Sequence, residues 1–592
     1  MEKSLKIGKL DVSLCCNNPG NWEFACTKGG DDEIGYLFVT LNNENEENYP
    51  AFTVKVRFPQ HEVVSRWQAD AFFNKHLAPE WNSRFESELA VGAPVAGYCS
   101  QNNVNKLICC SSDALRKTAW AGGPHEHDFF VETRMEFLTS PEAPAKEYSV
   151  VLRFDMREIS FNDALTDAFK WFEQFYKPIE VPAAGLEAWY STWYSYHKEL
   201  KDSVIEEECR MAKALGMSGV IVDDGWQTDK HDGIYDYTGD WEVAPSRIAD
   251  MKKHVDIVHS CGLKYMLWYS VPFIGGKSKN FERFKGKYLY SIERINANIL
   301  DPRFPEVREF LTGIYRDALI NYGIDGFKLD FIDRFSIAPG MVDPAIAENY
   351  AGRDIKNVPE AVDVLLTGIT EELRRIKSDV LIEFRQRYMG PAIRQYGNLI
   401  RATDCPGDIV ANRVRTVDLR HSSCGSAVHG DMLRWHDSDS AESAARQMLA
   451  VLFSVPQISV RNGDISDTHK EMLRHRIEFY KQHKETLVFG RIVAPHADQN
   501  YPIVRSEGNN EAVTAVYTEN GFVKLPFGKF ATEILVNASA TENVAVETTE
   551  ECTAEYYDVF GKLTEKKSIP AGLHMLNIPV SGECVFSKKT TA

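Results

Sequence analysis

Cysteine is scarce in this chain and forms no metal-binding pattern. Twelve cysteines are scattered over 592 residues, and no two of them stand in a C-x-x-C pair. Structural zinc sites usually need ligand pairs at such short spacing, and disulfide-rich secreted domains need a much denser set. We therefore expect buried, reduced thiols, no metal and no cofactor.

Patterns that bind phosphate groups or membranes are also missing. The chain contains no G-x-G-x-x-G or G-x-x-x-x-G-K-S/T motif, no Lys/Arg-rich run, and no stretch of about 18 uncharged apolar residues. Its 67 Lys and Arg against 85 Asp and Glu give a net charge of −18, which repels nucleic-acid backbones and anionic lipid. The sequence therefore argues against nucleic acid and membranes as partners.

The N-terminal residues do not resemble a secretory signal. MEKSLKIGKLDVSLCCNN contains lysines but no apolar core of signal-peptide length. The sequence thus predicts a cytoplasmic protein, although a chain trimmed of a leader would show the same N-terminus.

The apolar pattern changes twice along the chain. Residues 1–180 carry short period-two runs such as AFTVKVRFP, broken by turn residues, which predict an N-terminal β-sandwich. Residues 181–487 alternate short apolar runs with amphipathic helical stretches. Residues 488–592 return to short strands such as ATEILVN, which predict a small C-terminal antiparallel β-sandwich domain.

The middle region contains eight strand-plus-helix units. An open doubly wound sheet usually shows fewer strands and a glycine-rich phosphate turn, so eight units favour a (β/α)8 TIM barrel in an α/β protein. The predicted strands lie in LEAWYSTWYS, GVIVDDGW, KYMLWYSVP, DGFKLDF, DVLIEFRQ, NLIRATD, AVHGDMLRW and PQISVRN.

Polar and aromatic residues collect where these predicted strands end. In a TIM barrel the chemistry lies at the C-terminal ends of the strands. Carboxylates, arginines and tryptophans without metal-ligand spacing are typical of a sugar site, although such acids can instead cap helices or bridge loops. The candidate substrate-binding residues are Asp223, Asp224, Trp226, Trp268, Lys328, Arg385, Gln386, Arg401 and Asp408.

Two carboxylates are predicted to carry the chemistry. Glycoside cleavage needs one carboxylate to attack or to activate water and another to protonate the leaving oxygen. Asp330 and Asp404 end strands four and six and can face each other across the mouth. Lys328 shares a face of strand four with Asp330 and is expected to hold it ionised. Asp404 is expected to stay protonated if it is more desolvated.

Several segments resemble a known family. IVDDGWQ, TGDWEV, GLKYMLWY, ILDPRFPEVREFL and GIDGFKLDF occur in the order, and near the spacing, of the melibiase-type α-galactosidases of glycoside hydrolase family 36. The resemblance implies a retaining double displacement without a metal, with Asp330 as nucleophile and Asp404 as acid/base. It further implies that Asp223 and Asp224 bind hydroxyls on the C4 and C6 side of galactose. Trp268 and Lys328 then also contact the sugar.

The sequence departs from the family after strands three and five. The family's Cys-Ser-Gly-rich run is replaced by EFRQRYMGPAIR, and the Glu-Pro pair by YSVP. Arg385, Gln386 and Arg387 thus stand where the family has small residues. An added guanidinium can donate hydrogen bonds to an N-acyl oxygen, an anionic substituent or a neighbouring sugar. Alternatively, Arg385 or Arg387 pairs with Glu383 or Asp431 in the barrel rim.

The leading hypothesis is a retaining exo-acting α-galactosidase that cuts terminal galactose-configured residues from an oligosaccharide or glycoside. The alternatives are the same mechanism on an α-N-acetylgalactosaminide, an α-glucoside or an anionic galactoside, and a non-catalytic carbohydrate-binding relative. The resemblance also allows a homo-oligomer. Three roles stay open: Trp67 and Trp81 either reach over the mouth or pack in the first domain, and Asp408 either joins the site or caps the next helix.

Overall fold

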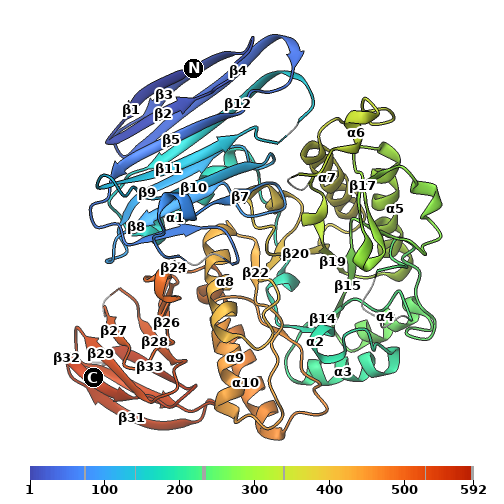
Figure 1. Ribbon diagram of the computed structural model, residues 1–592. Helices are drawn as coiled ribbons and strands as arrows, with labels where there is room; N and C mark the ends of the chain where they lie inside the picture. The colour runs from blue at the N-terminus through green and yellow to red at the C-terminus, as the bar shows by residue number, and fades with distance from the viewer. Residues whose placement is uncertain (73–74, 141, 230–234, 338–339, 527–528, 589–592) are drawn as a thin grey trace.

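The computed structural model describes residues 1–588 except 73–74, 141, 230–234, 338–339 and 527–528. An N-terminal β region and a smaller C-terminal β region lie one above the other on the same side of a barrel of parallel strands (Figure 1). The predicted fold class, a TIM barrel flanked by two β domains, is confirmed. The predicted boundaries at 180/181 and 487/488 stay predictions.

The N-terminal region contains two six-stranded antiparallel sheets. Their strands alternate buried and partly exposed residues, as in β5, so that one face of each sheet enters a shared apolar core. In spatial order the first sheet comprises β1 (Glu2–Ile7), β2 (Leu10–Cys15), β5 (Phe52–Pro59), β11 (Phe130–Phe137), β10 (Thr118–Pro124) and β7 (Phe85–Ser87). The second comprises β3 (Glu23–Gly30), β4 (Ile34–Glu47), β12 (Ala145–Asp155), β9 (Asn105–Ser111), β8 (Val95–Cys99) and β6 (Ser65–Gln68).

Helix α1 (Phe161–Trp171) joins this region to the barrel. It packs against β9 on one side and against α8 (Ile409–Ser422) of the barrel on the other. Ala164, Leu165 and Phe169 are fully buried in the core that the barrel and this helix share. The first domain is therefore fixed to the outside of the barrel through apolar contacts.

The barrel sheet contains the eight predicted strands, all paired in parallel. Bridges from His429 to Val455 and from Leu433 to Ile458 bring its two edges together, so the ring is nearly closed. In spatial order the strands are β22 (Ala427–His429), β21 (Leu399–Arg401), β20 (Leu381–Arg385), β19 (Gly326–Asp330), β15 (Lys264–Ser270), β14 (Gly219–Val222), β13 (Trp189–Ser191) and β23 (Gln457–Ile458).

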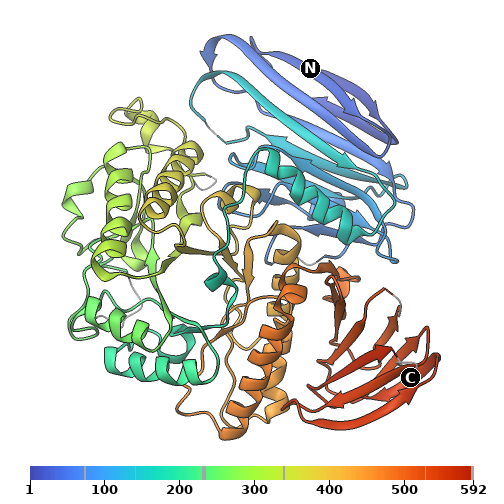
Figure 2. The ribbon, with the colours of Figure 1, turned by 180° about the vertical axis from the view of Figure 1, so that it is seen from behind.

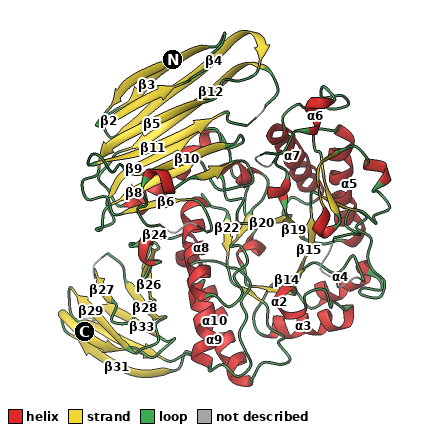
Figure 3. Ribbon diagram, viewed as in Figure 1, coloured by secondary structure: helices red, strands yellow, loops and turns green. Residues whose placement is uncertain are grey.

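Helices cover the outside of this ring (Figure 3). Their amphipathic pattern and caps explain where they form: Asp250, Ser440 and Ser466 cap helix N-termini with their side chains, and Gly323 ends α5 at φ 70°. Strand five is followed by a 3₁₀ turn, Pro391–Gln395, as the short PAIRQYG segment suggested. The remaining helices are α2 (Trp193–Tyr196), α3 (Asp202–Ala214), α4 (Met251–Ser260), α5 (Pro305–Tyr322), α6 (Pro344–Ala347), α7 (Val358–Ile376), α9 (Ala441–Ala450) and α10 (Asp467–Lys484).

A small antiparallel sheet after barrel strand three was not predicted. Strands β16 (Phe273–Gly275), β18 (Ala297–Leu300) and β17 (Tyr288–Ile292) pair in that order between β15 and α5. Phe273 of this insertion stacks on Phe331, which directly follows Asp330, with ring centroids 4.8 Å apart. The insertion therefore builds part of the wall near the end of strand four.

The C-terminal region contains a seven-stranded and a three-stranded sheet (Figure 2). The pairs β26–β28 and β27–β29 are parallel and the other pairs are antiparallel. The larger sheet comprises β24 (Arg491–Val493), β25 (Ile503–Glu507), β26 (Glu511–Val516), β28 (Thr532–Asn537), β33 (Glu583–Lys588), β30 (Cys552–Tyr557) and β31 (Leu563–Ile569). The smaller comprises β27 (Phe522–Leu525), β29 (Asn543–Thr548) and β32 (Gly572–Asn577).

Within the part of the chain that the structure describes, none of the helices combines the length and the apolar composition needed to cross a lipid bilayer.

Candidate active site

The polar strand ends predicted from the sequence meet at one end of the barrel. Strand register places Asp330 beside Ser270, and Lys328 between Trp268 and Glu383. Arg385 pairs with Arg401 in the same way on strands five and six. Because the strands are parallel, these residues lie on one rim.

Asp330 is buried at the end of β19 and surrounded by donors. Its side chain, 12% exposed, accepts hydrogen bonds from Arg385 Nε (2.6 Å), Tyr388 Oη (3.1 Å), Trp268 Nε1 (3.2 Å) and the Phe331 amide (2.7 Å). Burial alone would raise the pKa of this carboxyl, but the Arg385 guanidinium, helped by more distant cations, lowers it to about 2. Asp330 is therefore ionised, as a nucleophile must be.

The cation in direct contact with Asp330 is Arg385, whereas the predicted Lys328 lowers the pKa of Asp330 without contacting it. Lys328 Nζ lies 2.5 Å from Asp223 Oδ2, while Arg385 contacts Asp330 directly. The predicted alternative for Arg385, an ion pair with Glu383 or Asp431, is also wrong. A lysine on strand four can reach across to the buried acid after strand two, and Arg385, on the neighbouring strand, is closer to Asp330.

The adjacent acids Asp223 and Asp224 are each paired with a lysine. Asp223 accepts from Lys328, and Asp224 Oδ2 lies 3.3 Å from Lys198 Nζ. Gln227 Nε2 donates to Asp224 Oδ1 at 2.7 Å. Burial raises the pKa of Asp224, and Lys198 partly offsets this rise. Sequence reasoning missed Lys198, because nothing in the YHKEL segment indicates that it turns toward the loop after strand two.

Asp224 and Lys198 form a buried ion pair at this rim. Asp224 Oδ2 and Lys198 Nζ are both buried, and neither makes a hydrogen bond to another described residue, although their charges attract. The two charges offset each other at 3.3 Å, yet each group keeps the capacity for a further hydrogen bond. Hydroxyl groups, which both donate and accept, fit this arrangement.

Asp404 is more exposed than predicted. Its side chain is 52% exposed, and Arg401 Nη2 lies 3.0 Å from Asp404 Oδ1. Partial burial raises the pKa of this carboxyl, but the Arg401 guanidinium outweighs that effect and lowers it. The expectation that Asp404 is the desolvated, protonated acid of the empty site is therefore wrong. Repulsion from Asp330 also acts on Asp404, so the two carboxylates are within electrostatic reach of each other.

Arg401 connects Asp404 to two fully buried acids. Its guanidinium contacts Asp431 Oδ1 and lies 3.5 Å from Glu383 Oε1. Asp431 also accepts from the Cys405 amide (2.6 Å) and from Tyr194 Oη (2.9 Å), which encloses it completely. Burial raises the pKa of Asp431 despite the attraction of Arg401. Arg401 and Asp431 therefore hold the Asp404 loop in position through buried contacts.

Three predicted substrate-binding residues, Trp226, Gln386 and Asp408, have hydrogen-bond partners within the chain. Trp226 is fully buried, donates from Nε1 to the Trp268 carbonyl at 2.9 Å and stacks on Trp241. Gln386 is fully buried and accepts from the Thr403 amide at 3.2 Å, because the residue after Arg385 points to the other side of the strand. Asp408 caps α8 by accepting from the Val410 and Ala411 amides, which is the simpler of its two predicted roles.

The tryptophans of the first domain do not share one environment. Trp67 is buried and donates to Asp418 Oδ1 at 3.0 Å, so it packs within the protein rather than over the mouth. Trp81 is 58% exposed. Cys405, beside Asp404, is buried, and this burial raises the pKa of its thiol to about 12.

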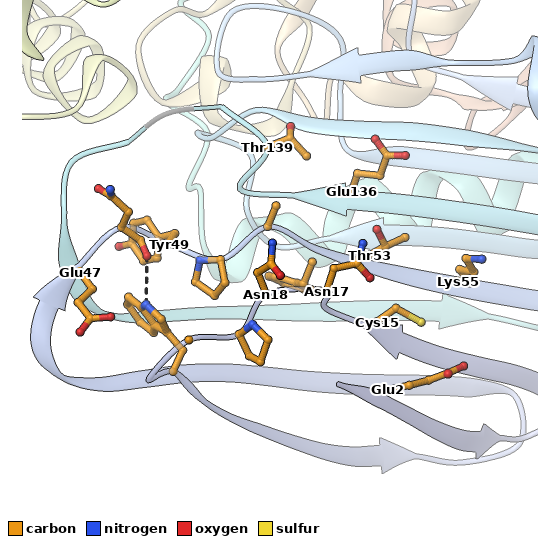
Figure 4. Close-up of a pocket in the computed structure, with 17 residues that line it drawn as sticks. Glu2, Cys15, Asn17, Asn18, Glu47, Tyr49, Thr53, Lys55, Glu136 and Thr139 are labelled. Carbon is orange, nitrogen blue, oxygen red and sulfur yellow. Dashed lines mark hydrogen bonds between the residues drawn. The ribbon is translucent and has the colours of Figure 1, made fainter.

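A second hollow lies far from this chemistry. A cavity of about 890 Å³ opens on the N-terminal sheets (Figure 4). Its Trp22 is only 6% exposed and donates to the Asn48 carbonyl at 3.1 Å, and Tyr49 Oη donates to the Glu147 carbonyl. The ring N–H of Trp22 and the hydroxyl of Tyr49 are thus already bonded within the chain. The barrel mouth is therefore the better candidate for the active site. Among the described residues, no three His, Cys, Asp or Glu side chains are grouped as a metal site would require.

Comparison with known proteins identifies the barrel. A family model described as Melibiase matches residues 171–342, which run from the end of α1 to just beyond strand four. These residues are similar to the melibiase family. Alpha-galactosidase 2 of Hypocrea jecorina is 26% identical over 156 residues, 24% of this chain and 21% of that protein.

Two solved structures share the fold of the barrel and of the β regions around it. The galactosidase domain of the alpha-galactosidase-sucrose kinase AgaSK superposes with a TM-score of 0.62 at 12% identity, covering 98% of this chain and 82% of that one. A variant of the GH36 alpha-galactosidase AgaA from Geobacillus stearothermophilus, in complex with raffinose, gives 0.61 at 11% identity, with 98% and 81% covered. The chain matches between 12% and 21% of the length of the first curated relatives.

Proposed function

We propose that the protein is a retaining exo-acting α-galactosidase that removes terminal α-linked galactose-configured residues from oligosaccharides or glycosides. The observation that carries this proposal is the ionised, fully hydrogen-bonded Asp330 on the same rim as Asp404. The melibiase match and the complexes of AgaA variants with raffinose and stachyose support an oligosaccharide as substrate.

We propose that the reaction is a double displacement. Asp330 attacks the anomeric carbon while Asp404 gives its proton to the leaving oxygen, so that the glycosidic bond breaks as an ester to Asp330 forms. In the second step Asp404, now ionised, takes a proton from water, and the water oxygen displaces Asp330. Arg385, Tyr388 and Trp268 stabilise the departing carboxylate, since their hydrogen bonds strengthen as its charge returns.

The free site holds Asp404 in the state that the second step needs. Arg401 favours the ionised carboxylate while water reaches it. Proton donation in the first step requires the pKa of Asp404 to rise, and a bound sugar can cause this by excluding water. We therefore infer that substrate binding causes Asp404 to take up the proton that it donates in the first step.

The Asp224–Lys198 pair is proposed to read the C4 and C6 hydroxyls. An axial hydroxyl at C4 is placed differently from an equatorial one, so the wrong sugar leaves a buried acceptor unpaired. We expect galacto-configured p-nitrophenyl α-glycosides to be preferred over gluco-configured ones by about a hundredfold in kcat/KM, or about 2.7 kcal/mol. Asp224→Asn should erode this preference. Asp229→Asn, in the same loop with a side chain 58% exposed, should keep it.

A glucoside cleaved as well as the galactoside by the wild-type protein would contradict this assignment of Asp224. The 2-acetamido analogue belongs in the same panel, because a C2-substituted substrate is the main alternative. Arg385 gives that alternative little support. Its Nε is bonded to Asp330 and its Nη1 to the Gln386 carbonyl (2.8 Å), so it is occupied by the chain itself.

Arg385 should instead control the acid limb of the pH profile. Asp330 reacts as a carboxylate, and Arg385 keeps its pKa low. In Arg385→Leu the burial of Asp330 would act without that compensation. The pKa of Asp330 would then rise, and the acid limb of the kcat/KM profile should move to higher pH by about one unit or more. Arg385→Lys, which keeps the charge, should shift it less. An unmoved acid limb in Arg385→Leu would show that Arg385 does not set the ionisation of the reacting group.

A further inference from the structure

We propose that Phe72 of the first domain, together with Arg387, forms the subsite for the leaving group, and that this subsite takes a second sugar ring. The inference rests on the proposed function, because it uses Asp404 as the acid. It assigns a role to Phe72 of the first domain, which lies outside the residues 171–342 that the melibiase model matches.

A loop of the first domain crosses to the barrel rim at Phe72. The loop follows β6, and its Ala71 carbonyl accepts from Arg415 Nε of α8 at 3.4 Å. The Arg415 guanidinium carbon lies 5.2 Å from the centre of the Phe72 ring, and that of Arg387 lies 5.9 Å away. Phe72 therefore sits between the loop that follows strand five and helix α8.

The same arginine fixes the backbone of the predicted acid. Arg415 Nη1 donates to the carbonyls of Thr403 and Asp404, both at 3.1 Å. Arg415 itself is only 9% exposed, so this link is held in place. Phe72 is thus one side chain away from the Asp404 loop, on the side where the first domain meets the barrel.

The role of Asp404 tells which part of a substrate would lie there. A general acid protonates the oxygen of the leaving group, so the outer surface beside it faces that group rather than the sugar that is attacked. Phe72 is 66% exposed there. An exposed aromatic ring at a catalytic rim is a surface on which the apolar face of a sugar can lie.

Arg387 supplies polar contacts beside this ring. Its carbonyl accepts from the Gly92 amide at 2.8 Å, so the first domain also holds its backbone. The residue is exposed, and among the described residues its guanidinium makes a cation–π contact with Phe72 but no ion pair. Five N–H donors on a fixed plane suit the hydroxyl groups of a sugar ring.

The test compares a leaving group that reaches this surface with one that does not. Melibiose, an α-galactosyl disaccharide, carries a sugar as leaving group, whereas α-galactosyl fluoride carries a single atom. For Phe72→Ala we expect the ratio of kcat/KM for the disaccharide to that for the fluoride to fall about tenfold. Arg387→Ala should lower the same ratio, and Phe72→Trp should restore it.

Trp81→Ala is the matched control, since Trp81 is a large aromatic residue in the same part of the first domain and is 58% exposed. It should leave the ratio unchanged. Equal losses on both substrates in Phe72→Ala, or no loss on either, would overturn the subsite. Failure of the wild-type protein to cleave the fluoride would overturn the proposed function instead. Calorimetric binding of the disaccharide to wild type and Phe72→Ala would then decide the subsite alone, with equal affinities overturning it.

Discussion

Asp330→Ala should lower kcat on p-nitrophenyl α-galactoside by about a thousandfold or more, because the nucleophile of the double displacement is lost. Small anions can enter the space of the missing carboxylate. Azide should therefore restore part of the cleavage and give β-galactosyl azide by a single displacement. The product is identified by NMR, and its β configuration distinguishes direct attack by azide from a residual two-step reaction.

A second variant at Asp330 is needed to separate the loss of the nucleophile from the loss of its hydrogen bonds. Asp330→Ala leaves the Arg385 guanidinium and Tyr388 without their partner, which can destabilise a buried site. Asp330→Asn keeps the size and part of the hydrogen bonding, so it should be as inactive as the alanine variant but closer to wild type in thermal unfolding. Retention of more than about a tenth of wild-type kcat in a folded Asp330→Ala protein, about 1.4 kcal/mol of barrier, would exclude Asp330 as nucleophile.

Asp404→Ala should affect substrates according to their leaving group. A p-nitrophenolate leaves with little protonation, so the first step should survive for the aryl glycoside while the second step slows and the glycosyl-enzyme accumulates. A disaccharide needs the proton, and its kcat/KM should fall about a thousandfold. Pre-steady-state measurement should show a burst of nitrophenol in the variant.

Asp408→Ala is the control for this comparison. Asp408 caps α8 in the same loop, so its loss should cost about 1 kcal/mol of stability without any dependence on the leaving group. If Asp404→Ala slowed the aryl glycoside and the disaccharide equally, Asp404 would not be the acid. Asp431 would be a poor substitute, since it is fully buried and bonded to Arg401, Cys405 and Tyr194.

The eight barrel strands were predictable because each is a short buried run that ends in polar residues. β19 and β20 illustrate this, with Gly326–Asp330 and Leu381–Arg385 found where the pattern placed them. Strand ends share a rim in any parallel barrel, so the sequence also predicted which side chains would gather. The insertion at residues 273–300 was missed because its strands are short and irregular.

The partners of the charged groups could not be predicted in the same way. Lys328 and Asp330 share a strand face, yet the lysine extends to Asp223 and an arginine from the next strand takes its place. Trp226 follows the loop motif but turns into the core. Phe72 reaches the rim from a domain whose packing on the barrel no local pattern describes. Which side chains contact each other at these positions depends on distances between strands and between domains.

Trapping of the glycosyl-enzyme tests the central claim most directly. A 5-fluoro-α-galactosyl fluoride should react with the wild-type protein and, because the second step is slowed, remain bound as an ester. Peptide mass spectrometry should locate the added mass on Asp330 alone. A label on Asp404 or on another carboxylate, or turnover that releases β-galactose first without any labelled peptide, would contradict a double displacement through Asp330.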